Sequence, residues 1–106
     1  MKGEVVVIPF PFSDLSNTKK RPALVIKPLT GDDTILCQIT SMQRQDQYSV
    51  SVSSSDFDQG SLSKDSFVRT NRLFTADSNI IIKSVGILKS KKMSEIITKL
   101  VQLIQS

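Results

Sequence analysis

The chain has 106 residues, a formal net charge of +4 at pH 7 and a pI of about 9.4. This length suits one domain spanning residues 1–106, and 39% hydrophobic with 23% charged residues is typical of a folded protein rather than a disordered one. No stretch approaches the roughly 20 apolar residues of a membrane-spanning helix, and the N-terminus lacks a signal-peptide core, so we expect a cytoplasmic protein. The basic excess fits a nucleic-acid partner, but it is also typical of ordinary surface charge.

Several residue types that support catalysis or metal binding are scarce. The chain has no His, which excludes imidazole triads and His-ligated zinc sites. The acidic residues come close together only at 32–33 and 56–58, so we expect no metal site and no cofactor. Cys37 is the single cysteine and lies in an apolar run, which predicts a buried thiol and excludes a disulfide within the chain. Any chemistry must therefore use Arg, Lys, hydroxyls, amides and a few acids.

The first 40 residues predict three strands. A β-branched run predicts a strand over 4–9, followed by two prolines that alternate with Phe10 and Phe12. We expect the two rings to cap the core, and a platform for stacking nucleic-acid bases is the alternative. A polar loop is expected over 13–20. Strands over 22–27 and 34–40 then flank a turn, so they should form an antiparallel hairpin.

That hairpin predicts a site at one end of the sheet. Arg21 precedes its first strand and Thr40 ends its second, so the pairing returns both residues to the same end. Pro22 restricts the backbone before it and should hold Arg21 stiffly. A guanidinium is permanently charged and matches phosphate oxygens, which indicates an anion site. The alternative is a solvated basic turn formed with Lys19 and Lys20.

The rest of the chain predicts further strands and one helix. Residues 48–53 alternate strictly between polar and apolar, as in a half-buried strand, and a loop with a turn at Gly60 follows over 54–64. Further strand segments are expected at 65–70, 71–75, 79–83 and 85–88. Helical spacing of apolar residues predicts a helix over 91–105 with Ser90 as its N-cap. Five to seven strands and one helix should close into a small barrel-like α+β domain.

Several of these segments, taken in order, resemble one protein family. They are Lys2–Phe10, Lys20–Ile26, Gln38–Ser41, Val68–Thr75, and Gly86 with Leu88 ahead of the terminal helix. The chain resembles the PemK/MazF-like toxins of bacterial type II toxin–antitoxin modules over nearly its full length. The resemblance implies a small SH3-like antiparallel β-barrel with a C-terminal α-helix, assembled as a homodimer.

The resemblance also implies a function. Such a toxin is a metal-independent, sequence-specific endoribonuclease that cleaves single-stranded mRNA by attack of the RNA's own 2′-hydroxyl on the phosphodiester. The implied catalytic residues are Arg21, which would stabilise the developing phosphate charge, and Thr40, which would donate a hydrogen bond to it. The implied RNA-binding residues are Lys19, Lys20, Ser41, Arg69 and Asn71.

Two departures from the family concern proton transfer. Asn71 stands where some members carry Asp, and the chain lacks the His that some members have in the first loop. The general base is therefore unassigned. Asp14, in the loop before Lys19, is one candidate, and capping of a turn is its alternative role.

The resemblance implies partners as well. An acidic, partly disordered antitoxin would cover the RNA groove and would join the toxin in binding operator DNA, which the toxin would not bind alone. One alternative is a non-enzymatic toxin of the same fold that binds a protein such as a topoisomerase, but those relatives use an aromatic C-terminal tip and this chain has no Trp. A degenerate SH3-like binding module is the other. Cleavage specificity should depend on loops 13–20, 42–47 and 53–64.

Overall fold

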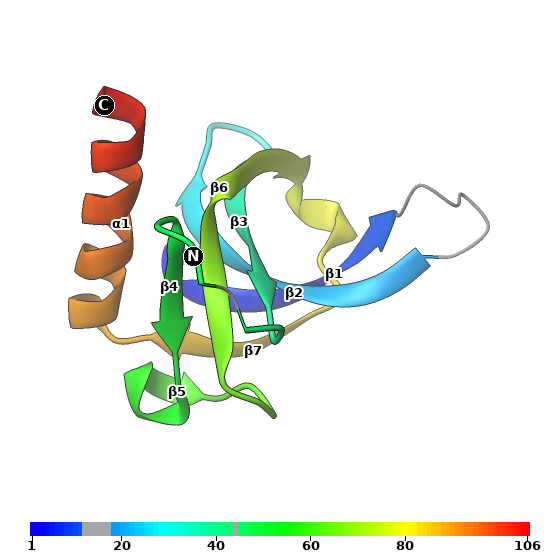
Figure 1. The fold of residues 1–106 in the computed structure, drawn as a ribbon. Helices are drawn as coiled ribbons and strands as arrows, with labels where there is room; N and C mark the ends of the chain where they lie inside the picture. The colour runs from blue at the N-terminus through cyan, green and yellow to red at the C-terminus, as the bar shows by residue number, and fades with distance from the viewer. Residues whose placement is uncertain (12–17, 44) are drawn as a thin grey trace.

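The computed structural model describes residues 1–11, 18–43 and 45–106 (Figure 1). Within these ranges the elements are β1 (Glu4–Pro11), β2 (Thr18–Pro28), β3 (Asp33–Thr40), β4 (Ser49–Val52), the 3₁₀ turn η1 (Ser54–Asp56), β5 (Phe57–Gly60), β6 (Ser66–Asp77), the 3₁₀ turn η2 (Ser78–Ile80), β7 (Lys83–Leu88) and α1 (Ser90–Gln105). The strands form one antiparallel sheet in the order β4-β6-β3-β2-β1-β7-β5. The sheet curls, and α1 stands beside it as the terminal element (Figure 1). The α+β, barrel-like prediction is confirmed.

The two faces of the sheet have different neighbours. One face, carrying Val5, Leu24 and Ile39, packs against Met93 and Ile96 of α1. The other face carries a second, smaller cluster, made of Val6, Ile8, Ala23, Val25 and Leu36. The alternation of side chains along each strand separates these sets. The helix therefore covers only one of the two faces.

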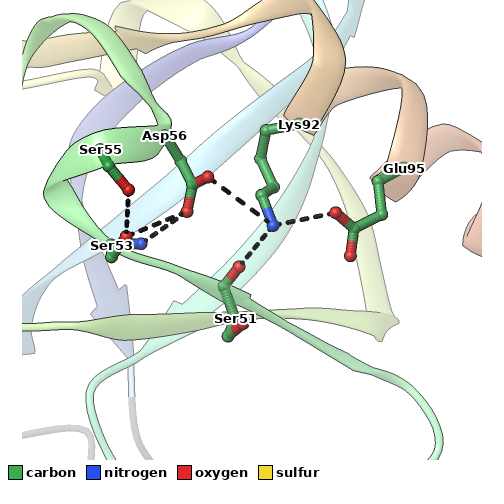
Figure 2. Close-up of polar contacts among 6 residues, drawn as sticks. All are labelled: Ser51, Ser53, Ser55, Asp56, Lys92 and Glu95. Carbon is green, nitrogen blue, oxygen red and sulfur yellow. Dashed lines mark hydrogen bonds and ion pairs between the residues drawn. The ribbon is translucent and has the colours of Figure 1, made fainter.

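A lysine ties the helix to the sheet at its first turn (Figure 2). Lys92 Nζ donates to the carbonyl of Ser51 at 3.1 Å and to Glu95 Oε1 at 2.9 Å, and it lies 3.8 Å from Asp56 Oδ1. Asp56 in turn accepts from the Ser53 N–H at 2.8 Å. The Lys92 side chain is only 13% exposed, and its contacts with Ser51 and Asp56 connect α1 to β4 and η1.

The predicted loop over 13–20 is wrong at its end, because β2 begins at Thr18. Lys19 and Lys20 pair with Phe10 and Pro9 in a two-stranded extension of β1 and β2. Beyond Val7, β1 pairs only with β2 among the described residues, so one edge of β1 is unpaired there. The two prolines, which have no N–H to donate, are tolerated at such an edge. Phe12 and Asp14 lie outside the described residues.

Three further expectations are corrected. The polar segment Phe57–Gly60 forms β5 by pairing with β7, although 54–64 was expected to be a loop. The strand expected over 79–83 is not formed as such: residues 79–80 belong to η2, which the Asp77 side chain starts by accepting from the Asn79 N–H at 2.8 Å, and only Lys83 is in a strand, β7. The N-cap of α1 is Lys89 rather than Ser90.

Other expectations are confirmed. The 22–27 and 34–40 segments pair as an antiparallel hairpin, and the two segments at 65–70 and 71–75 form one long strand, β6. Cys37 is fully buried, and burial raises the pKa of its thiol to about 12. The Phe10 ring packs edge-on against Phe74, with ring centroids 5.3 Å apart.

Candidate functional site

Arg21 and Thr40 lie at the same end and on the same face of the sheet. Ala23 of β2 is opposite Gln38 of β3, Arg21 lies two residues before Ala23, and Thr40 lies two residues after Gln38. Directly opposite residues, and residues two apart in one strand, share a face. This is the face opposite α1, because it also carries Ile8, the partner of Arg21 in β1. The predicted neighbourhood of the two residues therefore follows from the register.

Thr40 is held by its own turn. Its Oγ1 accepts a hydrogen bond from the Met42 N–H at 3.1 Å, and the residue is only 5% exposed. A hydroxyl that accepts one bond still has its proton to donate. Thr40 can therefore act as a fixed donor, whereas the neighbouring Ser41 is exposed.

A second arginine, Arg69, lies on the face of the sheet that carries Arg21 and Thr40. Arg69 of β6 is opposite Gln38 of β3 on one side and Ser49 of β4 on the other. Arg21 and Arg69 are both partly exposed, and their Nε atoms are buried. Asn71 is exposed. It lies in a bulge of β6, because Gln38 of β3 pairs with Arg69 and the adjacent Cys37 pairs with Leu73, which leaves the residues between them without partners in β3. The bulge therefore separates Asn71 from the row of residues that contains Arg69.

Asp46 is a carboxylate near Arg69. It accepts from the backbone N–H groups of Tyr48 at 2.9 Å and Ser49 at 2.8 Å. The bond from Tyr48, together with the bonds from Ser49 and the charge of Arg69, lowers the pKa of Asp46 below its usual value. A carboxylate stabilised in its charged form is a weaker base, so Asp46 is better suited to holding the turn than to proton abstraction.

A basic groove of about 620 Å³ opens beside Arg21. Its cationic side chains are Lys19, Lys20, Arg21, Lys64 and Lys83. Ser41 and three further serines, Ser61, Ser63 and Ser66, add hydroxyls, and its apolar residues are Val7, Pro22, Ile39, Leu62 and Val85. No Asp or Glu is among the described residues that line it. We call this cavity the basic groove. Arg21 lines it and also belongs to the face of the sheet that carries Thr40.

The register of three strands builds the floor of the basic groove. Val7 of β1 is opposite both Pro22 of β2 and Lys83 of β7, so these residues share a face. Lys20 lies two residues before Pro22 and falls on that face too. Long-range strand pairing therefore brings basic residues together that are more than 60 positions apart in the sequence.

The wall formed by 61–64 depends on Gly60. Gly60 has φ +71°, and a Cβ at this position would overlap the carbonyl of Val85. The chain then turns across β7, where the Ser61 N–H donates to Val85 at 3.2 Å. The Ser66 hydroxyl donates to the carbonyl of Lys64 at 3.0 Å and fixes the other end.

Four of the seven predicted site residues line the basic groove. They are Lys19, Lys20, Arg21 and Ser41. Thr40 is buried beside them, and Arg69 and Asn71 lie on β6 away from the groove. The sequence prediction did not include Lys64 and Lys83, because no local pattern distinguishes them from surface lysines. Only the pairing of β7 with β1 and the turn after Gly60 bring them to the site.

Comparison with known proteins establishes the family. In the described ranges, no helix has the length and apolar character that crossing a membrane requires. A search of curated protein sequences found no match. Among solved structures, MazE-MazF from Deinococcus radiodurans is similar with a TM-score of 0.79 and 18% identity, over 98% of this chain and 94% of that one.

Two mycobacterial structures are similar as well. An endoribonuclease in complex with its cognate antitoxin, from Mycobacterial species, has a TM-score of 0.77 and 17% identity, over 99% of this chain and 94% of that one. The toxin MazF-mt6 from Mycobacterium tuberculosis has a TM-score of 0.71 and 14% identity, over 94% of this chain and 96% of that one. At these identities the likeness concerns the fold. The family model for the PemK-like, MazF-like toxins of type II toxin-antitoxin systems matches residues 1–104, and the chain belongs to that family.

Proposed function

We propose that this protein is the toxin of a type II toxin–antitoxin module and acts as a metal-independent, sequence-specific endoribonuclease on single-stranded RNA. Family membership supports the toxin role. Relatives of the same fold that are named endoribonucleases support the activity. The observation that carries the proposal for this chain is the common face and common sheet end of Arg21 and Thr40.

The proposed reaction uses a nucleophile that RNA supplies. The 2′-oxygen attacks the adjacent phosphorus and its hydroxyl proton passes to water, while the bond to the 5′-oxygen of the next nucleotide breaks and that oxygen takes up a proton from water. The products end in a 2′,3′-cyclic phosphate and a 5′-hydroxyl. The protein then has to align the phosphate and stabilise its extra charge. Arg21 binds the non-bridging oxygens through its fixed charge, and the Thr40 hydroxyl donates a hydrogen bond to the same oxygens. Arg69 and Lys19 attract the strand electrostatically.

One assay tests the activity. Purified wild-type protein and the variants Arg21→Ala and Arg21→Lys are incubated with a long mixed-sequence single-stranded RNA in EDTA. The control variant is Lys27→Ala, because Lys27 is exposed and lies at the other end of β2 from Arg21. We expect discrete fragments with cyclic phosphate ends from wild type and Lys27→Ala, and loss of cleavage in both Arg21 variants, since an ammonium cannot reproduce the bidentate fork. Intact RNA with wild type would refute the nuclease proposal, as would equal cleavage by Arg21→Ala.

We also propose a cytoplasmic homodimer that binds an acidic antitoxin and joins it on operator DNA. An apolar groove of about 430 Å³, lined by Phe10, Leu73, Phe74 and Ile80, is our candidate dimer face. Leu73 and Ile80 of this groove are 43% and 38% exposed, and a contiguous patch of exposed apolar side chains is typical of a protein interface. Leu73→Lys should convert a dimer to a monomer in sedimentation experiments, and a monomeric wild type would contradict the proposal.

A further inference from the structure

We infer that the basic groove is a second phosphate subsite, which holds a backbone phosphate of the RNA strand beside the phosphate that is cleaved. The inference rests on the proposed ribonuclease function. Arg21 belongs to both places, because it shares the face of Thr40 and also lines the groove. The floor of the groove lies on the face of the sheet that carries Val7 and Pro22, opposite the face of Thr40. A strand whose scissile phosphate lies at Arg21 and Thr40 reaches the groove by passing around the end of the sheet at Arg21.

The lining of the basic groove has the chemistry of a polyanion site. Five cationic side chains and four serine hydroxyls surround it, with no carboxylate among the described lining residues. Lysines bind phosphate as point charges, and serine hydroxyls donate to phosphate oxygens. The apolar floor, which includes Val7 and Ile39, lowers the local dielectric and strengthens those interactions.

Two lysines distinguish this subsite from the catalytic pair. Lys64 and Lys83 line the basic groove from the wall after Gly60 and from β7. Both are placed by backbone interactions, since the Lys64 carbonyl accepts from Ser66 and Lys83 pairs with Val7. Their Cα positions are therefore set before RNA binds, which reduces the ordering cost of binding. Neither residue belongs to the face that carries Thr40.

The groove could also suit an acidic protein segment, since lysines attract carboxylates as well. The shared Arg21 favours RNA, because a covalent strand held at the scissile phosphate delivers its neighbouring phosphates to the adjoining surface at high effective concentration. A peptide has no such tether. We therefore assign the groove to RNA and make binding of acidic peptide an outcome of the test.

The experiment measures binding without cleavage. The probe is a fluorescein-labelled single-stranded DNA oligonucleotide of mixed sequence, which lacks the 2′-hydroxyl and cannot react. Its dissociation constant is measured at several salt concentrations for wild type, for Lys64→Gln/Lys83→Gln, and for a control of equal charge change, Lys27→Gln/Lys91→Gln, whose lysines are exposed and outside the groove. Circular dichroism checks that every variant is folded.

Loss of the one phosphate contact that these two lysines hold should reduce the slope of log K against log salt by about 0.7, the value for one contact on a single strand. The control should keep the wild-type slope. Equal slopes in the groove variant and the control would overturn the assignment, as would a groove variant that weakens binding of a polyglutamate peptide and leaves the DNA slope unchanged. The RNA cleavage assay on wild type tests the nuclease proposal separately, so a nuclease with unchanged slope refutes only the groove, and a changed slope without cleavage refutes only the nuclease.

Discussion

Replacing Thr40 with valine tests the structural and chemical roles of one hydroxyl separately. Valine has nearly the same shape but lacks the oxygen, so the Met42 N–H loses its acceptor at 3.1 Å. Leaving this partly buried donor unsatisfied should cost about 1–2 kcal/mol of unfolding free energy. For a domain of this size, with an unfolding entropy of about 2.1 cal/mol/K per residue, that corresponds to a fall in Tm of about 4–9 °C.

The expected catalytic effect is larger than the effect on stability. Removing one preorganised donor to a developing oxyanion costs about 10²- to 10³-fold in rate. Single-turnover cleavage of single-stranded RNA is measured well below the Tm of each variant, so that unfolding does not contribute. Thr40→Ser keeps the hydroxyl and should retain most of the activity, although it also loses a buried methyl group.

Two results would refute this reasoning. If Thr40→Val cleaves RNA as fast as wild type, the hydroxyl does not act on the phosphate. If Thr40→Val and Thr40→Ser lose activity equally, the loss reflects packing at this nearly buried position rather than donation. A melting temperature that does not change in Thr40→Val would contradict the role assigned to the Met42 bond.

Further outcomes follow from other parts of the fold. Lys92→Gln should lower stability by about 1–2 kcal/mol in urea unfolding because Lys92 ties the helix to the sheet, and the exposed neighbour Lys91→Gln should change it by less than about 0.5; equal effects would contradict the role of Lys92. Gly31→Ala should cost about 1 kcal/mol for its positive φ alone, and Gly60→Ala should cost about 3 kcal/mol or more because its Cβ also meets backbone. Equal losses would show that the chain at Gly60 relaxes freely. With a thiol pKa of about 12, Cys37 should resist Ellman's reagent near neutral pH and react fully in urea; rapid labelling of the folded protein would contradict its burial.

The sequence determined most of the local structure. Strict alternation and β-branched runs predicted the β1, β3 and β4 strands, and helical spacing predicted α1 to within a residue. The hairpin of β2 and β3 was predictable because a short turn leaves neighbouring strands few ways to pair. That pairing alone was enough to bring Arg21 and Thr40 to the same end of the sheet.

The tertiary structure decided what local pattern does not encode. β5 is too polar to be recognised as a strand and exists because β7 supplies its hydrogen bonds. The segment from Asn79 looks like the start of a strand, but the capping contact of Asp77 begins η2 there, and the next strand starts only at Lys83. Lys64 and Lys83 are ordinary surface lysines in the sequence, and they join Arg21 only because long-range strand pairing and the glycine turn bring three distant segments together. Local sequence sets each strand's preference, whereas the partners across the sheet decide which side chains meet.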